Sequence, residues 1–472
     1  MSREKKLVKN AAILAIGQLS SKVFTFLLLP IYTSLLAPDD FGTIDVLQTV
    51  ISLALYFVTL QIENAVFRFV IENRTNQENQ IGYVASAGAV LLVMAGISTV
   101  IIGIIHAFCE IPYFSLVMLA LWTQSTYLFV SNLARGLGRN ADYSIASFIV
   151  TVSSLAVNIV LIVGLKVGAA SILIALVVSN FIGFSYFLCR LRIWKLVKLS
   201  AVSSNKIQEM LRYSLPLIPN AISWWIANTS DRLIIICFLG TAFNGIYAAA
   251  NKIPTIYTTI FTVFNTAWTE SVSLAINDSD RDEYINSMLN NGFKLFSFVN
   301  MGIIVCVSLS FQWLIGKQYE DAYNHIFILL VAIFINSMCS LLGGVLGGLK
   351  DTKVIGWTTV VGAIVNALIN FALIQSIGLY AASISTLASY LIIYIFRMNA
   401  VKKVVSMKIS TRYLGQCAAM LLLVAVGYFR RSMLVNVVIL AVLVVWGVYQ
   451  NRTILVPLLS SLKMKVIRNV KE

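Results

Sequence analysis

The chain consists of long apolar stretches joined by short polar loops, and this pattern restricts it to a membrane. Hydrophobic residues make up 59% of the 472 residues and charged residues only 12%. About 20 apolar residues in a helix cross a hydrocarbon core about 30 Å thick. The stretches therefore predict an all-α membrane protein of about fourteen transmembrane helices, a helical bundle rather than a barrel. The predicted spans are residues 11–36, 41–62, 81–105, 111–130, 143–165, 168–188, 213–239, 242–268, 295–315, 324–348, 354–375, 377–396, 413–428 and 433–449.

The basic residues are distributed unevenly between the loops. Of 35 Lys and Arg residues, 28 fall in the termini and alternate loops that share one side of the membrane if the N-terminus is cytoplasmic. The opposite loops hold 4, namely Lys166, Lys317, Arg430 and Arg431. Cytoplasmic loops are enriched in Lys and Arg, so this split predicts two cytoplasmic termini and an even number of spans. The net charge of +15 then needs no nucleic acid, and membrane lipids are the expected partners.

Several features that mark secreted proteins or enzymes are missing from the sequence. The first apolar stretch is too long for a cleavable signal peptide and lacks a small-residue cleavage site. The six cysteines have no CxxC spacing, the two histidines lie near span ends, and no catalytic triad or nucleotide-binding loop is visible. We therefore expect no enzyme activity, no metal site and no cofactor. The longest connections, 189–212 and 269–294, are expected to contain amphipathic helices.

An internal repeat organises the spans. The repeat predicts two six-helix lobes in pseudo-twofold relation around a central cavity, an arrangement used by many transporters. The predicted parts are an N-lobe at 1–195, a C-lobe at 196–400, and a C-terminal helix pair with a basic tail at 401–472. The matched residues are Leu36 with Leu239 and Gly42 with Gly245 at an offset of 203, and Asn158 with Asn370, Leu161 with Leu373, Ile162 with Ile374 and Ala169 to Ile172 with Ala381 to Ile384 at an offset of 212.

Polar residues in spans 1, 2, 7 and 8 fall at helical spacing and so line one face of each helix. Lipid cannot satisfy such a face, because each unpaired polar group there costs several kcal/mol. These faces are predicted to meet around a hydrated cavity; the alternative is that they join helices through hydrogen bonds. In span 2 the face comprises Asp45, Gln48, Ser52, Tyr56, Thr59 and Glu63.

Three cations and two acids lie within the spans, namely Lys22, Arg232, Lys252, Asp45 and Asp231. An ionisable residue inside a membrane is functional or paired by default. The excess of cations predicts an anionic ligand, with phosphate the leading candidate. The alternatives are a salt bridge, such as Asp231 with Lys22 or Lys252, and snorkelling of Arg232 to the outer surface.

Other candidates surround these charges in the sequence. Trp224, next to Trp225, could stack on a sugar ring, although core packing explains such residues equally well. Prolines in the polar spans mark candidate bends, and a glycine cluster near the end of span 10 predicts close helix packing. These are Pro30, Pro216, Pro219 and Pro254, and Gly343, Gly344, Gly347 and Gly348.

The chain resembles the multidrug/oligosaccharidyl-lipid/polysaccharide flippase superfamily, and within it the bacterial O-antigen and capsule flippases (Wzx-type polysaccharide transporters). The resemblance implies two six-helix lobes around a cationic cavity, alternating access, and export of an undecaprenyl-diphosphate-linked oligosaccharide across the bacterial inner membrane. The residues that carry it are Lys9-Asn10, LLLPIYTSLLAPDDFG from Leu27, ENAVFRF from Glu63, YSLPLIP from Tyr213, NTSDRLIIICFLG from Asn228 and GIYAAANKI from Gly245.

These observations together predict a flippase for a lipid-linked oligosaccharide, with polysaccharide polymerase machinery as a further candidate partner. One rival is a drug/cation antiporter of the same superfamily, which would favour an acidic cavity. Another is a membrane glycan polymerase or acyltransferase, which would need a catalytic histidine or acid cluster. The predicted substrate-binding residues are Lys22, Lys252, Arg232, Trp224, Asn228, Gln48 and Asn251, with Asp45 and Asp231 orienting the cations or coupling to ions.

Overall fold

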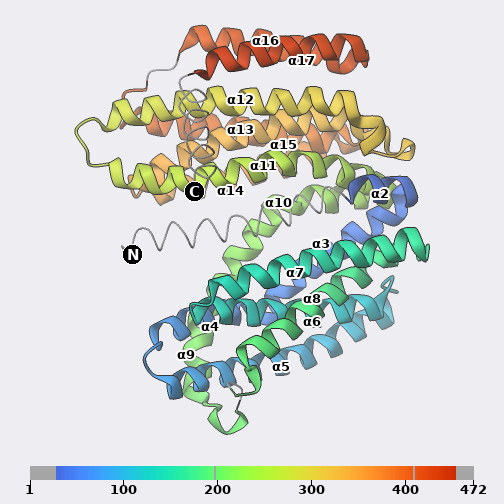
Figure 1. The fold of residues 1–472 in the computed structure, drawn as a ribbon, viewed down its shortest axis with the longest axis vertical. Coiled ribbons are helices and arrows are strands. Elements are labelled where there is room, and N and C mark those ends of the chain that lie inside the picture. Colours follow the sequence, from blue (N-terminus) through green and yellow to red (C-terminus); the bar gives the residue numbers. More distant parts are fainter. Residues whose placement is uncertain (1–27, 196–197, 408–409, 453–472) are drawn as a thin grey trace, which may run out of the picture. The chain divides into compact units, whose positions relative to one another are not determined.

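The computed structural model describes residues 28–195, 198–407 and 410–452 (Figure 1). Over these residues the chain is made of helices joined by short turns and contains no strand, which confirms the all-α prediction. The chain divides into two compact units, Met1–Ala248 and Ala249–Glu472. The predicted parts 1–195, 196–400 and 401–472 follow the internal repeat, whereas these two units are defined by how compactly their residues pack. The predicted parts therefore stay a prediction.

The first unit is built around the packing of α6 on α4 and α8, of α7 on α8, and of α10 on α3. The short helix α9 lies against α4 and α5, which is why this unit extends beyond residue 195. Its helices are α2 (Leu29–Leu35), α3 (Pro38–Thr59), α4 (Ile62–Glu72), α5 (Gln77–Phe108), α6 (Phe114–Gly136), α7 (Asn140–Ile159) with the π-helix η1 (Val160–Gly164), α8 (Ala170–Leu191), η2 (Ile193–Lys195), η3 (Leu199–Ala201), α9 (Ser204–Ser214), α10 (Leu217–Leu239) and the start of α11 (Thr241–Ala275).

In the second unit α15 packs on both α13 and α14, and α12 packs on α13. The last two helices, α16 and α17, lie side by side along α12 (Figure 1). They are the predicted C-terminal pair. Beyond the remainder of α11, the helices of this unit are α12 (Arg281–Leu314), η4 (Lys317–Tyr319), α13 (Ala322–Gly348), α14 (Thr352–Ile377), α15 (Tyr380–Lys402), α16 (Thr411–Arg430) and α17 (Met433–Gln450).

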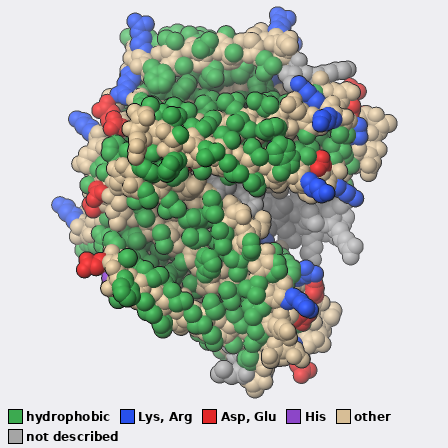
Figure 2. All heavy atoms as spheres, turned by 180° about the vertical axis from the view of Figure 1, so that it is seen from behind, with side chains coloured by type: hydrophobic (Ala, Val, Ile, Leu, Met, Phe, Trp, Pro, Cys, Tyr) green, Lys and Arg blue, Asp and Glu red, His purple; other side chains and the backbone are tan. Residues whose placement is uncertain are grey.

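Eleven helices among the described residues are long and apolar enough to cross a membrane. Large apolar side chains on them point outward, such as Leu92 (74% exposed), Phe371 (63%) and Val445 (71%). On the face drawn in Figure 2, hydrophobic side chains cover the lengths of the helices while charged side chains gather near helix ends. Water disfavours such a surface and lipid favours it, so the protein crosses the membrane many times.

The count of fourteen spans stays a prediction. The polar helices α10 and α11 have 23 and 35 residues, long enough to cross a membrane, but they are not among the eleven apolar ones. The first predicted span, 11–36, falls largely outside the described residues.

Two predicted spans are broken where the backbone requires it. Helix α3 ends at Thr59 because Leu60 and Gln61 adopt left-handed backbone angles, with φ of 51° and 56°. The prediction that Glu63 belongs to the polar face of span 2 is therefore wrong, because Glu63 lies on a separate helix, α4 (Ile62–Glu72). The predicted span 213–239 is also divided, because α9 ends at Ser214 and α10 begins only after Pro216. Pro254, by contrast, lies inside α11 without ending it.

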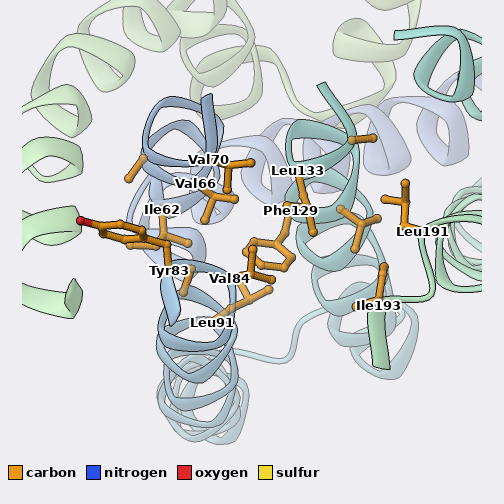
Figure 3. Packing of buried hydrophobic residues seen from close by; sticks show 14 of the residues in the cluster. Ile62, Val66, Val70, Tyr83, Val84, Leu91, Phe129, Leu133, Leu191 and Ile193 are labelled. Carbon is orange, nitrogen blue, oxygen red and sulfur yellow. The ribbon is translucent and has the colours of Figure 1, made fainter. Parts of the chain in front are cut away.

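A buried apolar cluster holds the first unit together (Figure 3). The ring of Phe129 from α6 lies next to Val84 of α5, and Val66 of α4 is fully buried beside them. The amphipathic helix α9 closes this cluster by burying Met210, while the Glu209 carboxylate accepts a 2.7 Å hydrogen bond from the Tyr83 hydroxyl. This confirms the amphipathic helix expected in the connection 189–212.

The helix boundaries repeat along the chain, as the internal repeat predicts. At an offset of 212, the ends of α6 and α13 coincide, as do the starts of α7 and α14. At an offset of 203, the starts of α3 and α11 coincide. The order α6–α7–α8 is thus repeated by α13–α14–α15, and in each set the first two helices pack on the third.

The turn between α6 and α7 has the same hydrogen bonds as the turn between α13 and α14. Gly138 and Lys350 occupy equivalent left-handed positions, with φ of 78° and 62°. The next residues, Arg139 and Asp351, donate their backbone N–H to the carbonyl five residues earlier, at 2.8 and 2.9 Å. The two turns are the same structural motif built from different residues.

The repeat-related glycines Gly42 and Gly245 touch each other within the first unit. A Cβ added to Gly42 would overlap the carbonyl oxygen of Thr241, and one added to Gly245 would overlap that of Pro38. The two contacts are equivalent, because the offset of 203 relates Gly42 to Gly245 and Pro38 to Thr241. The first turns of α3 and α11 therefore pack backbone to backbone, which only glycine permits here.

We expect Gly42→Ala and Gly245→Ala each to destabilise the protein strongly, because the added methyl group would push two helix backbones apart. Overpacking of this kind typically costs about 1–3 kcal/mol. Gly96→Ala and Gly103→Ala in α5 are matched controls, since nothing lies within 4 Å of a Cβ there. Thermal unfolding of the purified proteins should show a lower midpoint for the first pair only. Equal midpoints for all four variants would contradict the close contact.

Candidate functional site

An ion pair between helices α3 and α10 is the centre of the candidate site. Arg232 Nη1 lies 3.2 Å from Asp45 Oδ1 and donates a 3.1 Å hydrogen bond to Thr49 Oγ1. The Asp45 side chain is 5% exposed and that of Arg232 is 25% exposed. The carboxylate is therefore enclosed, whereas part of the guanidinium stays accessible.

Asn244, from the first turns of α11, completes the surroundings of Asp45. Its amide nitrogen Nδ2 donates to Asp45 Oδ2 at 3.3 Å and to the carbonyl oxygen of Gly42 at 3.1 Å. Both carboxylate oxygens of Asp45 thus accept a donor, and one fully buried amide joins α11 to α3 next to the glycine contact. A buried carboxylate needs such partners to remain charged.

The second acid, Asp231, faces a different helix from its neighbour Arg232. The hydroxyl of Tyr247 on α11 donates a 3.1 Å hydrogen bond to Asp231 Oδ2. Consecutive helical residues are about 100° apart, so Arg232 reaches α3 while Asp231 reaches α11. Two adjacent charges of α10 thereby bind it to both helices.

Trp225 also connects α10 to α3, about two helical turns before Arg232 along α10. Its indole Nε1 donates to Ser52 Oγ at 2.9 Å and to the carbonyl oxygen of Thr49 at 3.3 Å. The residue is only 9% exposed, so Trp225 serves packing, the alternative weighed for it. Trp224 and Asn228 belong to the same helix, and their proposed contact with sugar stays a prediction.

Asp45 and Thr49 hold the Arg232 guanidinium beside the polar face of α3. Within the described residues, Nη1 is the only guanidinium nitrogen of Arg232 with a side-chain partner. The other N–H groups can donate to an anionic ligand. Asp45 offsets the charge of Arg232, however, so this arginine offers directed hydrogen bonds more than net positive charge. Of the roles weighed for Arg232, the structure thus shows pairing with an acid rather than snorkelling.

The remaining predicted site residues are distributed differently. Gln48 is half-buried on α3, one turn from the ion pair, and Lys22 lies outside the described residues. Asn251 and Lys252 follow on α11 within the second unit, where both make contacts. Their substrate-binding roles remain predictions. Among the residues that the structure describes, no group of three or more His, Cys, Asp or Glu side chains could hold a metal ion.

Thr49, Asn244 and Tyr247 were not predicted as site residues. Thr49 follows Gln48 and lies four residues after Asp45 on α3, so helical spacing could have placed it beside that acid. Asn244 and Tyr247 could have been found, because with Asn251 they follow helical spacing of three and four residues along α11.

Arg397 is a further buried cation that the sequence analysis assigned to a loop. The predicted span ended at residue 396, but α15 continues to Lys402 because no proline or glycine interrupts it. Arg397 is 8% exposed and donates to the carbonyl oxygen of Cys339 at 2.9 Å and to Thr359 Oγ1 at 3.0 Å. It therefore ties α15 to α13 and α14.

The glycine cluster of α13 makes room for bulky side chains. A Cβ on Gly343 would lie 3.0 Å from the guanidinium of Arg397, and one on Gly344 would lie 2.7 Å from the indole nitrogen of Trp268. The predicted close packing is thus real at these two glycines, but side chains rather than a second backbone occupy the space. Gly347 has nothing within 4 Å of a Cβ, so packing does not explain it.

The chain is similar to proteins of polysaccharide and glycan biosynthesis. The family described as "Polysaccharide biosynthesis protein" matches residues 7–269, more than half of the chain. The "Lsg locus putative protein 1" of Haemophilus influenzae is 24% identical over 345 residues, 69% of this chain and 81% of that protein. The "Probable low-salt glycan biosynthesis flippase Agl15" of Haloferax volcanii is 22% identical over 255 residues. That match covers 52% of this chain and spans only about half (53%) of that relative.

Two solved structures share the fold over most of the chain. An inward-facing multidrug resistance MATE family transporter of the MOP superfamily has a TM-score of 0.67 and 13% identity, covering 83% of this chain and 99% of that one. The lipid II flippase MurJ in an inward closed conformation has a TM-score of 0.64 and 12% identity, covering 93% and 99%. The fold is therefore that of this group of membrane transporters.

Proposed function

Because the chain belongs to the polysaccharide biosynthesis protein family, we propose that it is a flippase for a lipid-linked oligosaccharide. It would carry an undecaprenyl-diphosphate-linked unit of O-antigen, capsule or exopolysaccharide from the inner to the outer leaflet by alternating access. The observation that carries this proposal is the Asp45–Arg232 pair, which holds a partly exposed guanidinium between helices α3 and α10.

The names of two relatives support this assignment over its rivals. One is called a glycan biosynthesis flippase, and the other, with the same fold, is a flippase for lipid II. The family and these neighbours are transporters, so the chain is a transporter rather than a glycan polymerase or acyltransferase. The fold shared with a multidrug transporter keeps a drug/cation antiporter as the second candidate.

The proposed roles of the site residues follow from charge. Lys22 and Lys252 would compensate the diphosphate, and Arg232 would direct N–H groups towards it while Asp45 fixes its orientation. Asp231, which accepts a hydrogen bond from Tyr247, would orient the cations or couple transport to ions. The sugar would be contacted by Trp224, Asn228, Gln48 and Asn251, which offer an aromatic face and amide groups.

The membrane potential can drive this transport without a nucleotide-binding site. Moving one charge across the membrane is worth about 2.3 kcal/mol per 100 mV. A diphosphate with about two negative charges would therefore gain about 4–5 kcal/mol per 100 mV on leaving an inside-negative cell. This gain requires that the protein's own cations stay behind.

The proposal is tested by reconstituting the purified protein into liposomes with the host's own lipid-linked oligosaccharide. Transport is measured as protection of the glycan from a membrane-impermeant glycosidase or lectin. We expect protein-dependent movement of this lipid and no efflux of ethidium, a typical organic cation. Ethidium efflux without glycan movement would instead establish the antiporter.

We place the protein in the bacterial inner membrane with both termini in the cytoplasm, on the strength of the 28 to 4 division of basic residues. Reporter fusions after Glu472 and within 189–212 should then report the cytoplasm, and fusions at Asp39 or Thr241 the exterior. An external signal from Glu472 would rule out an even number of spans.

A further inference from the structure

A second polar site lies in the second unit, where α12 ends and α16 turns into α17. A cavity of about 730 Å³ opens there. Its lining includes Gln312, Trp313, Lys317, Glu320, Tyr323 and Arg431. The volume falls in the range of about 300–1,000 Å³ that is usual for small-ligand sites. None of these residues belongs to the Asp45–Arg232 site.

The basic residues of this cavity are unusual for their predicted side of the membrane. Only four of the 35 basic residues fall in the predicted external loops. Two of the four, Lys317 and Arg431, line this cavity, and Arg430 is the neighbour of Arg431 in the chain. External loops have fewer Lys and Arg residues than cytoplasmic ones, so the presence of two of the four at one cavity makes it a candidate ligand site.

The cavity contains a rigid aromatic and charged wall. The ring of Tyr323 stacks on Tyr428 with centroids 4.1 Å apart, and its hydroxyl donates to the carbonyl oxygen of Tyr428 at 2.7 Å. The guanidinium of Arg431 lies 4.3 Å from the centroid of the Tyr323 ring, and its Nη1 lies 2.6 Å from Glu320 Oε1. Arg431 and Glu320 are therefore oriented before any ligand binds.

The chemistry of this wall suits a sugar better than a phosphate. Trp313 is 74% exposed, and Gln312, Lys317 and Glu320 are exposed as well. Sugar rings pack on aromatic faces, and their hydroxyls donate to carboxylates and accept from Lys, Arg or Gln. The Glu320 carboxylate is an acceptor that sugar hydroxyls can use, whereas an ionised phosphate group has no proton to donate to it.

We propose that this cavity binds the oligosaccharide of the transported lipid at the external surface of the inner membrane. Trp313 provides the stacking face, and Lys317, Glu320 and Gln312 provide hydrogen bonds to sugar hydroxyls. The site receives the hydrated end of the substrate after translocation. This inference rests on the proposed flippase function.

The test uses the full-length protein in nanodiscs and, as probe, the water-soluble oligosaccharide released by mild acid from the host's lipid-linked pool. Binding is measured by titration calorimetry. Trp313→Ala and Lys317→Gln should each weaken binding about tenfold, since each removes one principal contact. Phe108→Ala and Lys166→Gln are matched controls, because Phe108 is an 85% exposed aromatic residue and Lys166 another predicted external cation. Neither control should change the affinity.

The transport assay separates failure of this site from failure of the flippase function. Lipid-linked glycan transport by the wild type, together with equal oligosaccharide binding by all four variants, would overturn the exit site alone. Absence of transport by the wild type would overturn the flippase proposal itself. If Trp313→Ala changes only the retention of phosphatidylglycerol in the nanodiscs, Trp313 is an interfacial anchor and the sugar site is wrong.

Discussion

Replacing Lys252 with glutamine should abolish export of the glycan at unchanged protein levels, whereas arginine at this position should keep part of it. Glutamine has nearly the same length but no charge, so the diphosphate would lose a cation in an environment of low dielectric constant. A hydrogen bond to a charged group contributes about 1.5–3 kcal/mol, or roughly 10- to 150-fold in affinity. Arginine preserves the charge with altered geometry. The measurement is surface glycan, or liposome transport, normalised to folded protein.

The same pair of substitutions applies to Lys22, and Lys353→Gln is the control. Lys353 is exposed at the start of α14, outside the proposed site, and its loss should leave export unchanged. Equal export by the glutamine and arginine variants of Lys22 and Lys252 would refute the proposed diphosphate binding. The two lysines would then be structural residues.

Arg232→Gln should destabilise the protein by about 3–5 kcal/mol, because it leaves the enclosed Asp45 carboxylate without its cation. The double variant Asp45→Asn/Arg232→Gln should recover most of this loss, since no uncompensated charge remains. Arg68→Gln is the matched control, because its ion pair with Glu72 is about half exposed on both sides and its loss should change stability little. Thermal unfolding in detergent, measured for all four proteins, gives the comparison.

Transport by the double variant then separates the two roles of Arg232. A folded double variant that does not transport would mean that the guanidinium contacts the substrate. Full transport would mean that the ion pair only joins α3 to α10. Equal stability of Arg232→Gln and the wild type would contradict the ion pair itself.

The sequence alone determined most of the helices and their approximate ends. The spans predicted at 242–268 and 433–449 correspond to α11 (Thr241–Ala275) and α17 (Met433–Gln450). Transfer of a segment from water into lipid depends on its own composition, so apolar stretches identify themselves without knowledge of their neighbours. The repeat was also visible in the sequence, because equivalent glycines and turns recur at a constant offset.

Which polar groups meet depends on the tertiary structure. Asp45 pairs with Arg232, and Asn244 bonds to Asp45, although these residues lie in helices far apart in the sequence. Hydropathy and periodicity show that a helix has a polar face, but not which other helix satisfies it. The burial of Arg397 likewise depends on neighbouring helices, since its partners lie on α13 and α14. Lateral packing is decided by contacts between distant segments, and these exist only in the folded protein.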